Sequence, residues 1–243
     1  GMGSVEGPPG SFIAPNNELG LALTMVVPLM YYLFSISSRR IVRWGLLGAM
    51  ILTSMSVLGT HSRGALLAIV AMGVFLWLKN PAKLRNGVIL VALGAALIAF
   101  MPQTWVARMQ TIESYQTDSS AEGRLNAWSM SWHLALDRPI GGGFEVITPE
   151  LFQRYAPDPT NLHAAHSIYF QVLGEHGFPG LFLFLLLWFL GWRTAARIKS
   201  LASGREDLAW ATRLALMVQV SLVAYLVGGA FLSLAYFDLP YDL

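Results

Sequence analysis

The sequence predicts an all-α fold, a polytopic transmembrane helical bundle of about six spans with one large loop that contains short helices. The chain of 243 residues is 55% hydrophobic and only 12% charged, and its mean hydropathy is +0.53, whereas soluble domains average about 25% charged residues. Long apolar runs flank a single polar stretch, residues 102–177. Because about 20 apolar residues suffice to cross a bilayer, we expect these runs to be membrane spans.

The apolar runs divide the chain into three parts. The expected spans lie at about residues 19–38, 41–60, 64–78, 87–101, 178–192 and 208–236. Residues 1–101 then hold an entry loop and four spans, 102–177 form the large loop, and 178–243 hold two further spans. Glu18 lies just before the first span, where the positive end of the helix dipole favours an acid. The chain opens in a Gly/Pro-rich loop and stops soon after an apolar run, so we expect a piece of a longer protein.

Basic residues predict how the bundle is oriented. Three short connections carry the following lysines and arginines: Arg39, Arg40, Arg43, Lys79, Lys83, Arg85, Arg193, Arg197, Lys199 and Arg205. If the spans alternate, all three connections lie on one side, which the positive-inside rule makes the cytoplasm. The large loop and the turn that holds Arg63 are then periplasmic.

Composition also excludes some functions. The net charge of +2 is spread over short clusters between apolar runs and does not form the basic, aromatic-rich stripe of a nucleic-acid interface, so no nucleic-acid partner is expected. The chain has no cysteine, which excludes disulfides and thiolate metal sites.

Within the large loop, one segment is predicted to be an amphipathic helix. A serine pair precedes an acidic residue at 119–122, which is typical of a helix start, and a proline at 139 marks its end. Leu125, Trp128, Trp132 and Leu136 recur at helical spacing and predict a face that lies on the membrane surface or on the spans. Arg124 lies near the helix start, where it either helps to bind an anion or serves only the local structure. The glycines at 141–143 are expected to form a flexible turn.

A second helix is predicted from about residue 162 to 176, which would place His163 and His166 on one face. Two histidines at this spacing could bind zinc, but catalytic zinc needs a third protein ligand that no motif supplies, so we expect no metal. A histidine that accepts a proton from a hydroxyl group is the stronger hypothesis.

Arg63 stands at the boundary of the third expected span. Charged residues at such boundaries are functional candidates, although simple extension of the side chain to the lipid headgroups is the alternative.

Five motifs follow one another along the chain: His61-Ser62-Arg63-Gly64-Ala65, Gly123-Arg124-Leu125-Asn126-Ala127-Trp128, Asp137-Arg138-Pro139-Ile140-Gly141-Gly142-Gly143-Phe144, His163-Ala164-Ala165-His166-Ser167-Ile168-Tyr169 and Glu175-His176-Gly177. In this order they resemble the O-antigen ligase and polymerase superfamily of bacterial membrane proteins. The chain looks most like the branch of probable O-glycosylation ligases associated with exosortase A systems. The resemblance extends from about residue 10 to the C-terminus.

The resemblance implies an inner-membrane glycosyltransferase that moves a glycan from an undecaprenyl-diphosphate carrier to a periplasmic acceptor, either a protein or a glycan. It implies that Arg63 and Arg124 hold the lipid diphosphate and that His166 activates the acceptor hydroxyl, without a nucleotide sugar, a metal or another cofactor. Glu175 would orient His166 or His176.

Three further residues are candidate contacts to the sugar or acceptor: His163, Tyr169 and Trp128. The two aromatic residues serve equally well as interfacial anchors. Two other functions stay open. A polymerase of the same superfamily would perform the same chemistry on a second lipid-linked glycan. A non-catalytic transporter or export partner of lipid-linked glycans would bind diphosphate but would not need His166.

Overall fold

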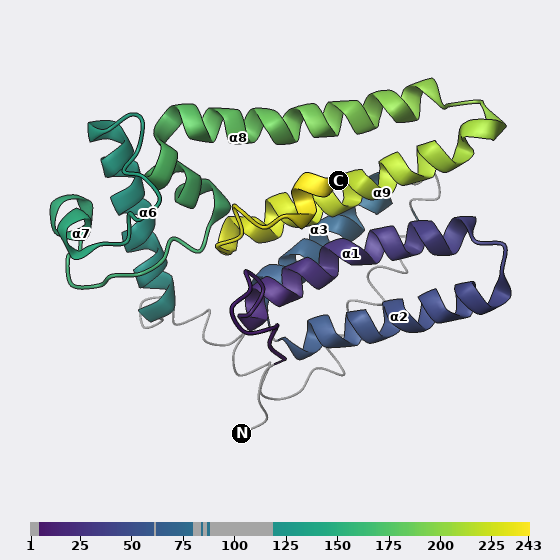
Figure 1. The fold of residues 1–243 in the computed structure, drawn as a ribbon, viewed down its shortest axis with the longest axis horizontal. Coiled ribbons are helices and arrows are strands. Elements are labelled where there is room, and N and C mark those ends of the chain that lie inside the picture. Colours follow the sequence, from purple (N-terminus) through teal and green to yellow (C-terminus); the bar gives the residue numbers. More distant parts are fainter. Residues whose placement is uncertain (1–4, 61, 80–83, 85–86, 88–118) are drawn as a thin grey trace.

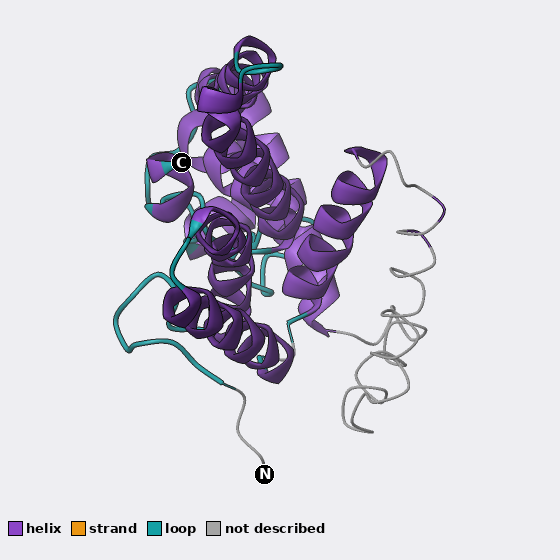
Figure 2. Ribbon diagram, turned by 90° about the vertical axis from the view of Figure 1, so that its right-hand side faces the viewer, coloured by secondary structure: helices purple, strands orange, loops and turns teal. Residues whose placement is uncertain are grey.

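The computed structural model describes residues 5–60, 62–79, 84, 87 and 119–243, and in these residues it contains helices and loops but no strand (Figure 2). The long helices are α1 (Asn16–Ile36), α2 (Arg40–Gly59), α3 (Arg63–Lys79), α8 (Ile168–Leu201) and α9 (Ala209–Gly228). The large loop contributes α6 (Ser119–Asp137) and α7 (Pro149–Tyr155), and three short 3₁₀ turns are η2 (Glu206–Leu208), η3 (Gly229–Phe231) and η4 (Leu239–Asp242). The predicted all-α class is confirmed for the described part of the chain.

Four of the described helices are long and apolar enough to cross a membrane: α1, α2, α8, and α9 together with its flanking turns. The third expected span corresponds to α3, which has 17 residues. At about 1.5 Å per residue this helix is shorter than the roughly 30 Å hydrocarbon core. Most of the fourth expected span, residues 87–101, lies outside the described residues.

The long helices lie side by side, and α9 packs against α1, α3 and α8 (Figure 1). Helix α6 runs across one end of this bundle and packs against α8, while α7 packs on α6 (Figure 1). The α1–α2 and α8–α9 connections lie at the opposite end (Figure 1), and seven of the ten basic residues predicted to be cytoplasmic lie in or near them. The fold therefore separates the basic connections from the polar loop.

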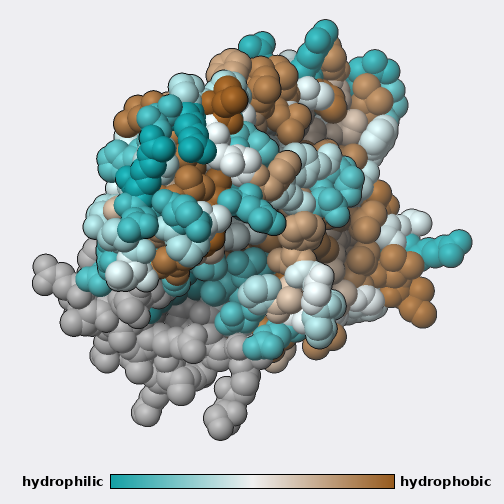
Figure 3. Space-filling view, turned by 60° about the vertical axis from the view of Figure 1, so that its left-hand side comes forward, coloured by the Kyte–Doolittle hydropathy of each residue, from teal (hydrophilic) through white to brown (hydrophobic). Residues whose placement is uncertain are grey.

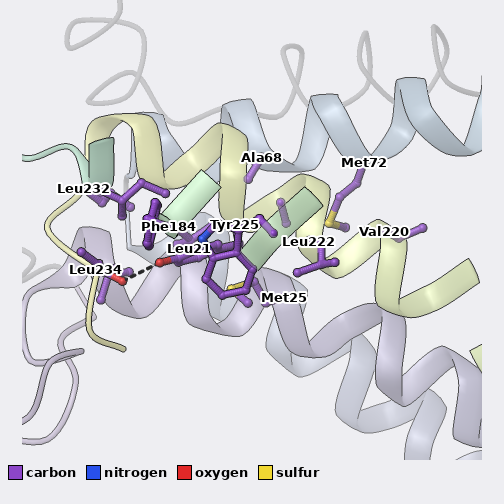
Figure 4. Close-up of a cluster of buried hydrophobic side chains, with 14 of the residues drawn as sticks. Leu21, Met25, Ala68, Met72, Phe184, Val220, Leu222, Tyr225, Leu232 and Leu234 are labelled. Atoms are coloured by element: carbon purple, nitrogen blue, oxygen red, sulfur yellow. Dashed lines mark hydrogen bonds between the residues drawn. The ribbon is translucent and has the colours of Figure 1, made fainter. Parts of the chain in front are cut away.

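The core of the bundle forms where α1, α3, α8 and α9 meet (Figure 4). Fully buried side chains from these helices include Leu21, Met25, Ala68 and Val220. The Tyr225 hydroxyl donates a hydrogen bond of 3.0 Å to the carbonyl of Leu234 (Figure 4).

The C-terminal bound of the last expected span is wrong. This span was predicted to be helical to about residue 236. The α-helix ends at Gly228, and the chain turns back so that Leu232, Leu234 and Ala235 pack into the same core. A glycine pair at 228 and 229 weakens a helix by about 1 kcal/mol per residue, which favours this early end. The returning segment reaches the polar end of the bundle.

Helix α8 joins the predicted loop helix and the fifth expected span into one element with a kink at Gly177, whose φ is 63° and ψ is −161°. Pro179 has no N–H to donate to the carbonyl of Glu175, so the helix cannot satisfy that group by itself. The N–H of Gly143 donates to it at 2.9 Å. The N–H of Gly141 donates to the carbonyl of Arg138 at 2.8 Å, as expected of a turn. That this turn is flexible stays a prediction.

Two further backbone bonds complete this contact. The N–H of Gly142 donates to the carbonyl of Gly174 at 2.9 Å, and the N–H of Phe178 donates to the carbonyl of Pro139 at 2.9 Å. We call residues 139–143 and 174–178 together the glycine clasp. It joins the loop after α6 to the kink in α8, because the carbonyls of Gly174 and Glu175 and the N–H of Phe178 all find partners across the contact.

The clasp gives a first prediction, Gly177→Ala. A Cβ at this position would overlap the carbonyl oxygen of Pro139, and the positive φ is strained for alanine. We expect the variant to unfold at a clearly lower temperature, with a loss of at least about 1–3 kcal/mol from backbone strain alone. Thermal unfolding in detergent measures this. Gly191→Ala is the control, because Gly191 lies in the same helix with open space around its Cβ position. Equal melting temperatures for the two variants would contradict the clasp.

Candidate active site

The site is built where α6 meets the segment that precedes α8. The predicted helix at the start of this region is confirmed as α6, and Arg124 lies half-buried in its second turn. Gly123, beside it, is in contact with the ring of His163: a Cβ at Gly123 would lie 2.8 Å from the His163 Cγ. The glycine before Arg124 therefore allows a histidine ring to pack directly on the helix.

Asn126 anchors the first part of the histidine segment to α6. Its Nδ2 donates to the carbonyls of Asp158 at 2.7 Å and Asn161 at 2.9 Å, and its Oδ1 accepts from the N–H of Asp158 at 2.8 Å. Its side chain is buried, so these bonds are shielded from water. Asn126 was not among the predicted site residues, although its place in the Gly-Arg-Leu-Asn-Ala-Trp motif could have indicated a role.

Trp128 anchors the second part of the segment. Its Nε1 donates to the carbonyl of Ala165 at 2.6 Å, and its ring stacks on Phe170 with centroids 4.9 Å apart. The structure thus gives Trp128, a candidate sugar contact, a role in attaching the segment of His166 to α6.

The helix predicted from residue 162 is wrong at its start. Residues 161–167 are not helical, and α8 begins at Ile168. The physical reason lies in α6, because Asn126 and Trp128 bind carbonyl groups that a helix would use internally. His163 and His166 therefore do not share a helix face, yet their rings remain neighbours with centroids 5.5 Å apart.

His166 has an unusual backbone, with φ of 41°, in the left-handed region that non-glycine residues rarely adopt. Strained residues of this kind cluster at functional sites. Burial lowers the pKa of the imidazole, and the positive charge of Arg124 and the neighbouring His163 lower it further, to about 4. At neutral pH His166 is therefore an uncharged imidazole beside a guanidinium group.

Glu18 is the acidic neighbour of His166. From the sequence it was expected only to interact with the positive end of the helix dipole. Its side chain is 6% exposed, and its Oε1 lies 3.9 Å from the His166 Nδ1. The carboxylate accepts backbone hydrogen bonds from Glu18 and Ser233, and the charge of Arg124 acts on it. A buried carboxylate at a span boundary was the signal that could have found it.

Arg63 is the first residue of α3 and is exposed. Ser62 precedes it and caps the helix, because its Oγ accepts a hydrogen bond from the N–H of Ala65 at 3.2 Å. The same Oγ donates to the carbonyl of Asn17, the residue before Glu18, at 3.5 Å. The start of α3 is thus joined to the start of α1, which places Arg63 and Glu18 at the same end of the bundle.

Glu175 belongs to a second polar cluster. It accepts a hydrogen bond from the Tyr236 hydroxyl, which also contacts the His176 Nε2 at 2.8 Å, and Phe144 packs edge-on against the His176 ring at 4.9 Å. Of the two histidines that Glu175 was expected to orient, it approaches His176 through Tyr236. Its carboxylate accepts side-chain hydrogen bonds from Tyr236 and Gln171.

Tyr169, another candidate acceptor contact, points toward α9. Its hydroxyl donates to the carbonyl of Leu226 at 2.7 Å, and its ring packs against Phe184. Within residues 5–60, 62–79 and 119–243, no group of three or more His, Asp or Glu side chains is placed to hold a metal ion. His61, the first residue of the motif around Arg63, lies outside the residues that the structure describes.

The face of the molecule that holds α6 and α7 carries many hydrophilic side chains. With this end brought forward, they gather in the upper left of the view, and hydrophobic side chains gather at its lower right (Figure 3). The candidate site thus lies where exposed polar surface meets the ends of the long apolar helices.

The sequence of the chain matches a known protein family. The O-antigen ligase family matches residues 48–185, which is more than half of the chain. The chain belongs to the O-antigen ligase family. Membership implies ligase-type glycan transfer from lipid-linked substrates at a membrane. No curated protein and no solved structure matches the chain.

The matched segment of this O-antigen ligase family member contains Arg63, Arg124, His163, His166 and Glu175. The structure brings Arg124, His163 and His166 together. It adds Glu18 and Ser233, which lie outside the matched segment.

Proposed function

We propose that the protein is a membrane glycosyltransferase of the periplasmic side of the inner membrane, which moves a glycan from an undecaprenyl-diphosphate carrier to an acceptor hydroxyl. The observation that carries the proposal is the position of His166 near Arg124: the His163 ring lies 5.5 Å from that of His166 and packs on Gly123, the residue before Arg124. Burial and the charge of Arg124 both favour the uncharged imidazole. Arg124 can stabilise a diphosphate leaving group and His166 can accept a proton. The resemblance to exosortase-associated O-glycosylation ligases favours a protein acceptor, and polysaccharide ligation is the related outcome.

Arg124 and Arg63 are the proposed diphosphate ligands. A guanidinium group offers planar, permanently charged donors that match phosphate oxygens. Arg63 adds its position at the first turn of α3, because a helix start attracts anions through its dipole and free N–H groups. Two arginines can supply the positive charge that a divalent ion supplies in other glycosyltransferases, so the reaction is proposed to need no metal.

In the transfer step, the acceptor oxygen attacks the anomeric carbon from the face opposite the diphosphate. The acceptor O–H proton moves to His166, the bond from the anomeric carbon to the phosphate oxygen breaks, and undecaprenyl diphosphate leaves with the bonding electrons. Attack from the opposite face inverts the anomeric centre. The developing negative charge on the leaving diphosphate is where Arg124 contributes most.

The pKa of His166 gives a second prediction. Since Arg124 lowers this pKa to about 4 together with burial and His163, replacing it with glutamine removes a positive charge and should raise the pKa toward the ordinary value of about 6.5. The acid limb of the pH profile of kcat/KM should therefore move to higher pH. NMR titration of labelled histidine in Arg124→Gln measures the shift. Arg138→Gln, an exposed arginine after α6, is the control, and an unchanged pKa in Arg124→Gln would contradict this effect of Arg124.

A transfer assay tests the proposed function. The full-length protein in liposomes is supplied with an undecaprenyl-diphosphate-linked glycan and, in separate reactions, with a protein, a lipid-linked glycan or a lipid acceptor. Transfer to protein or lipid supports a ligase, whereas chain growth only on the lipid-linked glycan would show the polymerase. Donor binding without transfer to any acceptor would favour the transporter or export partner.

A further inference from the structure

Resting on the proposed function, we infer that Glu18 is a positioning residue for His166. It holds the proton of the imidazole on Nδ1 and so leaves Nε2 unprotonated to accept the acceptor's proton. Nothing in the family match points to this residue, because the matched segment begins at residue 48.

Two backbone hydrogen bonds hold the Glu18 carboxylate, which accepts the N–H groups of Glu18 and Ser233. Its Oε1 faces the Nδ1 of His166 at 3.9 Å, which is longer than a hydrogen bond. We expect this distance to shorten when donor and acceptor bind, because catalytic hydrogen bonds often tighten only in the reacting complex.

The surroundings of His166 explain why such a partner is needed. The charged or titratable groups that face it are Arg124, His163 and Glu18. The first two disfavour the imidazolium that forms when the ring takes a proton. An ionised Glu18 carboxylate is the group that would stabilise that imidazolium, and because it faces Nδ1 it would select the tautomer with a free Nε2.

The proton path follows from this assignment. The acceptor O–H proton passes to Nε2, the Nδ1 proton stays between the ring and Glu18, and Glu18 itself takes no proton. The role is that of the carboxylate in a nucleophile–histidine–acid triad, which orients the histidine.

The position of Glu18 also makes α1 part of the site. This helix brings the carboxylate to His166, and the buried side chains of Leu21 and Met25 hold the same helix in the core. The segment after α9 completes the contact through Ser233.

The test compares wild type with Glu18→Gln, Glu18→Asp, His166→Ala and Glu122→Gln, all in the full-length protein. Glu122→Gln makes the same change at an exposed position of α6. We expect Glu18→Gln to lower kcat by about 10²-fold or more, with donor affinity within about twofold of wild type, and Glu18→Asp to recover part of the rate. Nitrogen NMR of labelled histidine should show the Nδ1–H tautomer in wild type and its loss in Glu18→Gln.

Two outcomes would overturn the inference. One is a kcat for Glu18→Gln equal to that of Glu122→Gln while His166→Ala is inactive, which would leave the proposed function standing. The other is an unchanged His166 tautomer in a folded, donor-binding Glu18→Gln protein. Failure of wild type to transfer any glycan would instead contradict the proposed function, and the tautomer would still be read independently.

Discussion

Alanine in place of His166 is expected to lower glycan transfer by about 10²–10⁴-fold, the usual contribution of a general base. Binding of the lipid-linked donor should change little, because the proposed diphosphate ligands are arginines. The loss should therefore appear in kcat and not in donor affinity. Initial rates of transfer and a direct donor-binding measurement in the same detergent separate the two effects.

His133 provides the matched control for this prediction. It is an exposed histidine of α6 that contacts Ser129 and the backbone carbonyl of Tyr155. His133→Ala should transfer glycan at close to the wild-type rate. A full rate for His166→Ala, or a loss of donor binding as large as its loss of rate, would be incompatible with a general base at this position.

The second large effect is expected at Arg124. Its replacement by alanine removes a cation whose charge acts on His166, so the leaving diphosphate loses electrostatic stabilisation, and transfer should fall by about 10²–10³-fold. Donor affinity should fall as well, since the guanidinium also binds the ground state. Arg124→Lys should recover only part of the activity, because lysine keeps the charge but loses the planar pair of donors.

Donor titration and kcat/KM measured on Arg124→Ala, Arg124→Lys and the exposed-residue control Arg138→Ala check this prediction. Arg63→Ala belongs in the same series, with a smaller expected loss because the side chain is exposed. If Arg124→Ala bound and transferred like Arg138→Ala, the diphosphate site would have to lie elsewhere.

The all-α class and most of the long helices could be predicted because they depend on local composition. Apolar runs flanked by arginines predict α1, α2, α8 and α9 from the hydrophobic effect alone. What lay beyond this reasoning was the end of α9, where the chain turns back at Gly228. That turn depends on packing of Leu232 and Leu234 into a core shared by distant helices.

The histidine segment shows why local patterns fail at the site. The sequence of residues 162–176 predicts one helix, yet Trp128 of α6 binds the carbonyl of Ala165 in its first part, and Asn126 binds the carbonyl of Asn161 just before it. Tertiary hydrogen bonds thus override helix propensity, and His166 takes a left-handed backbone conformation that no periodicity can indicate.

Glu18 illustrates the opposite difficulty, a residue in a predictable element whose role is not local. The helix start around it could be predicted, but its neighbour His166 is far away in the sequence. Only the fold brings α1, the histidine segment and Ser233 together. The glycine clasp also depends on contacts between distant residues. Gly142 and Gly143 form backbone hydrogen bonds with the kink in α8, which the sequence around these glycines does not indicate.

The most direct measurement is a single-turnover reaction in liposomes with EDTA present, in which purified full-length protein meets an undecaprenyl-diphosphate-linked glycan and its acceptor. We predict that wild type releases one undecaprenyl diphosphate for each glycan transferred, with inversion at the anomeric carbon, and that His166→Ala releases none. Transfer that requires an added metal ion, or equal transfer by His166→Ala, would contradict a reaction carried by Arg124 and His166.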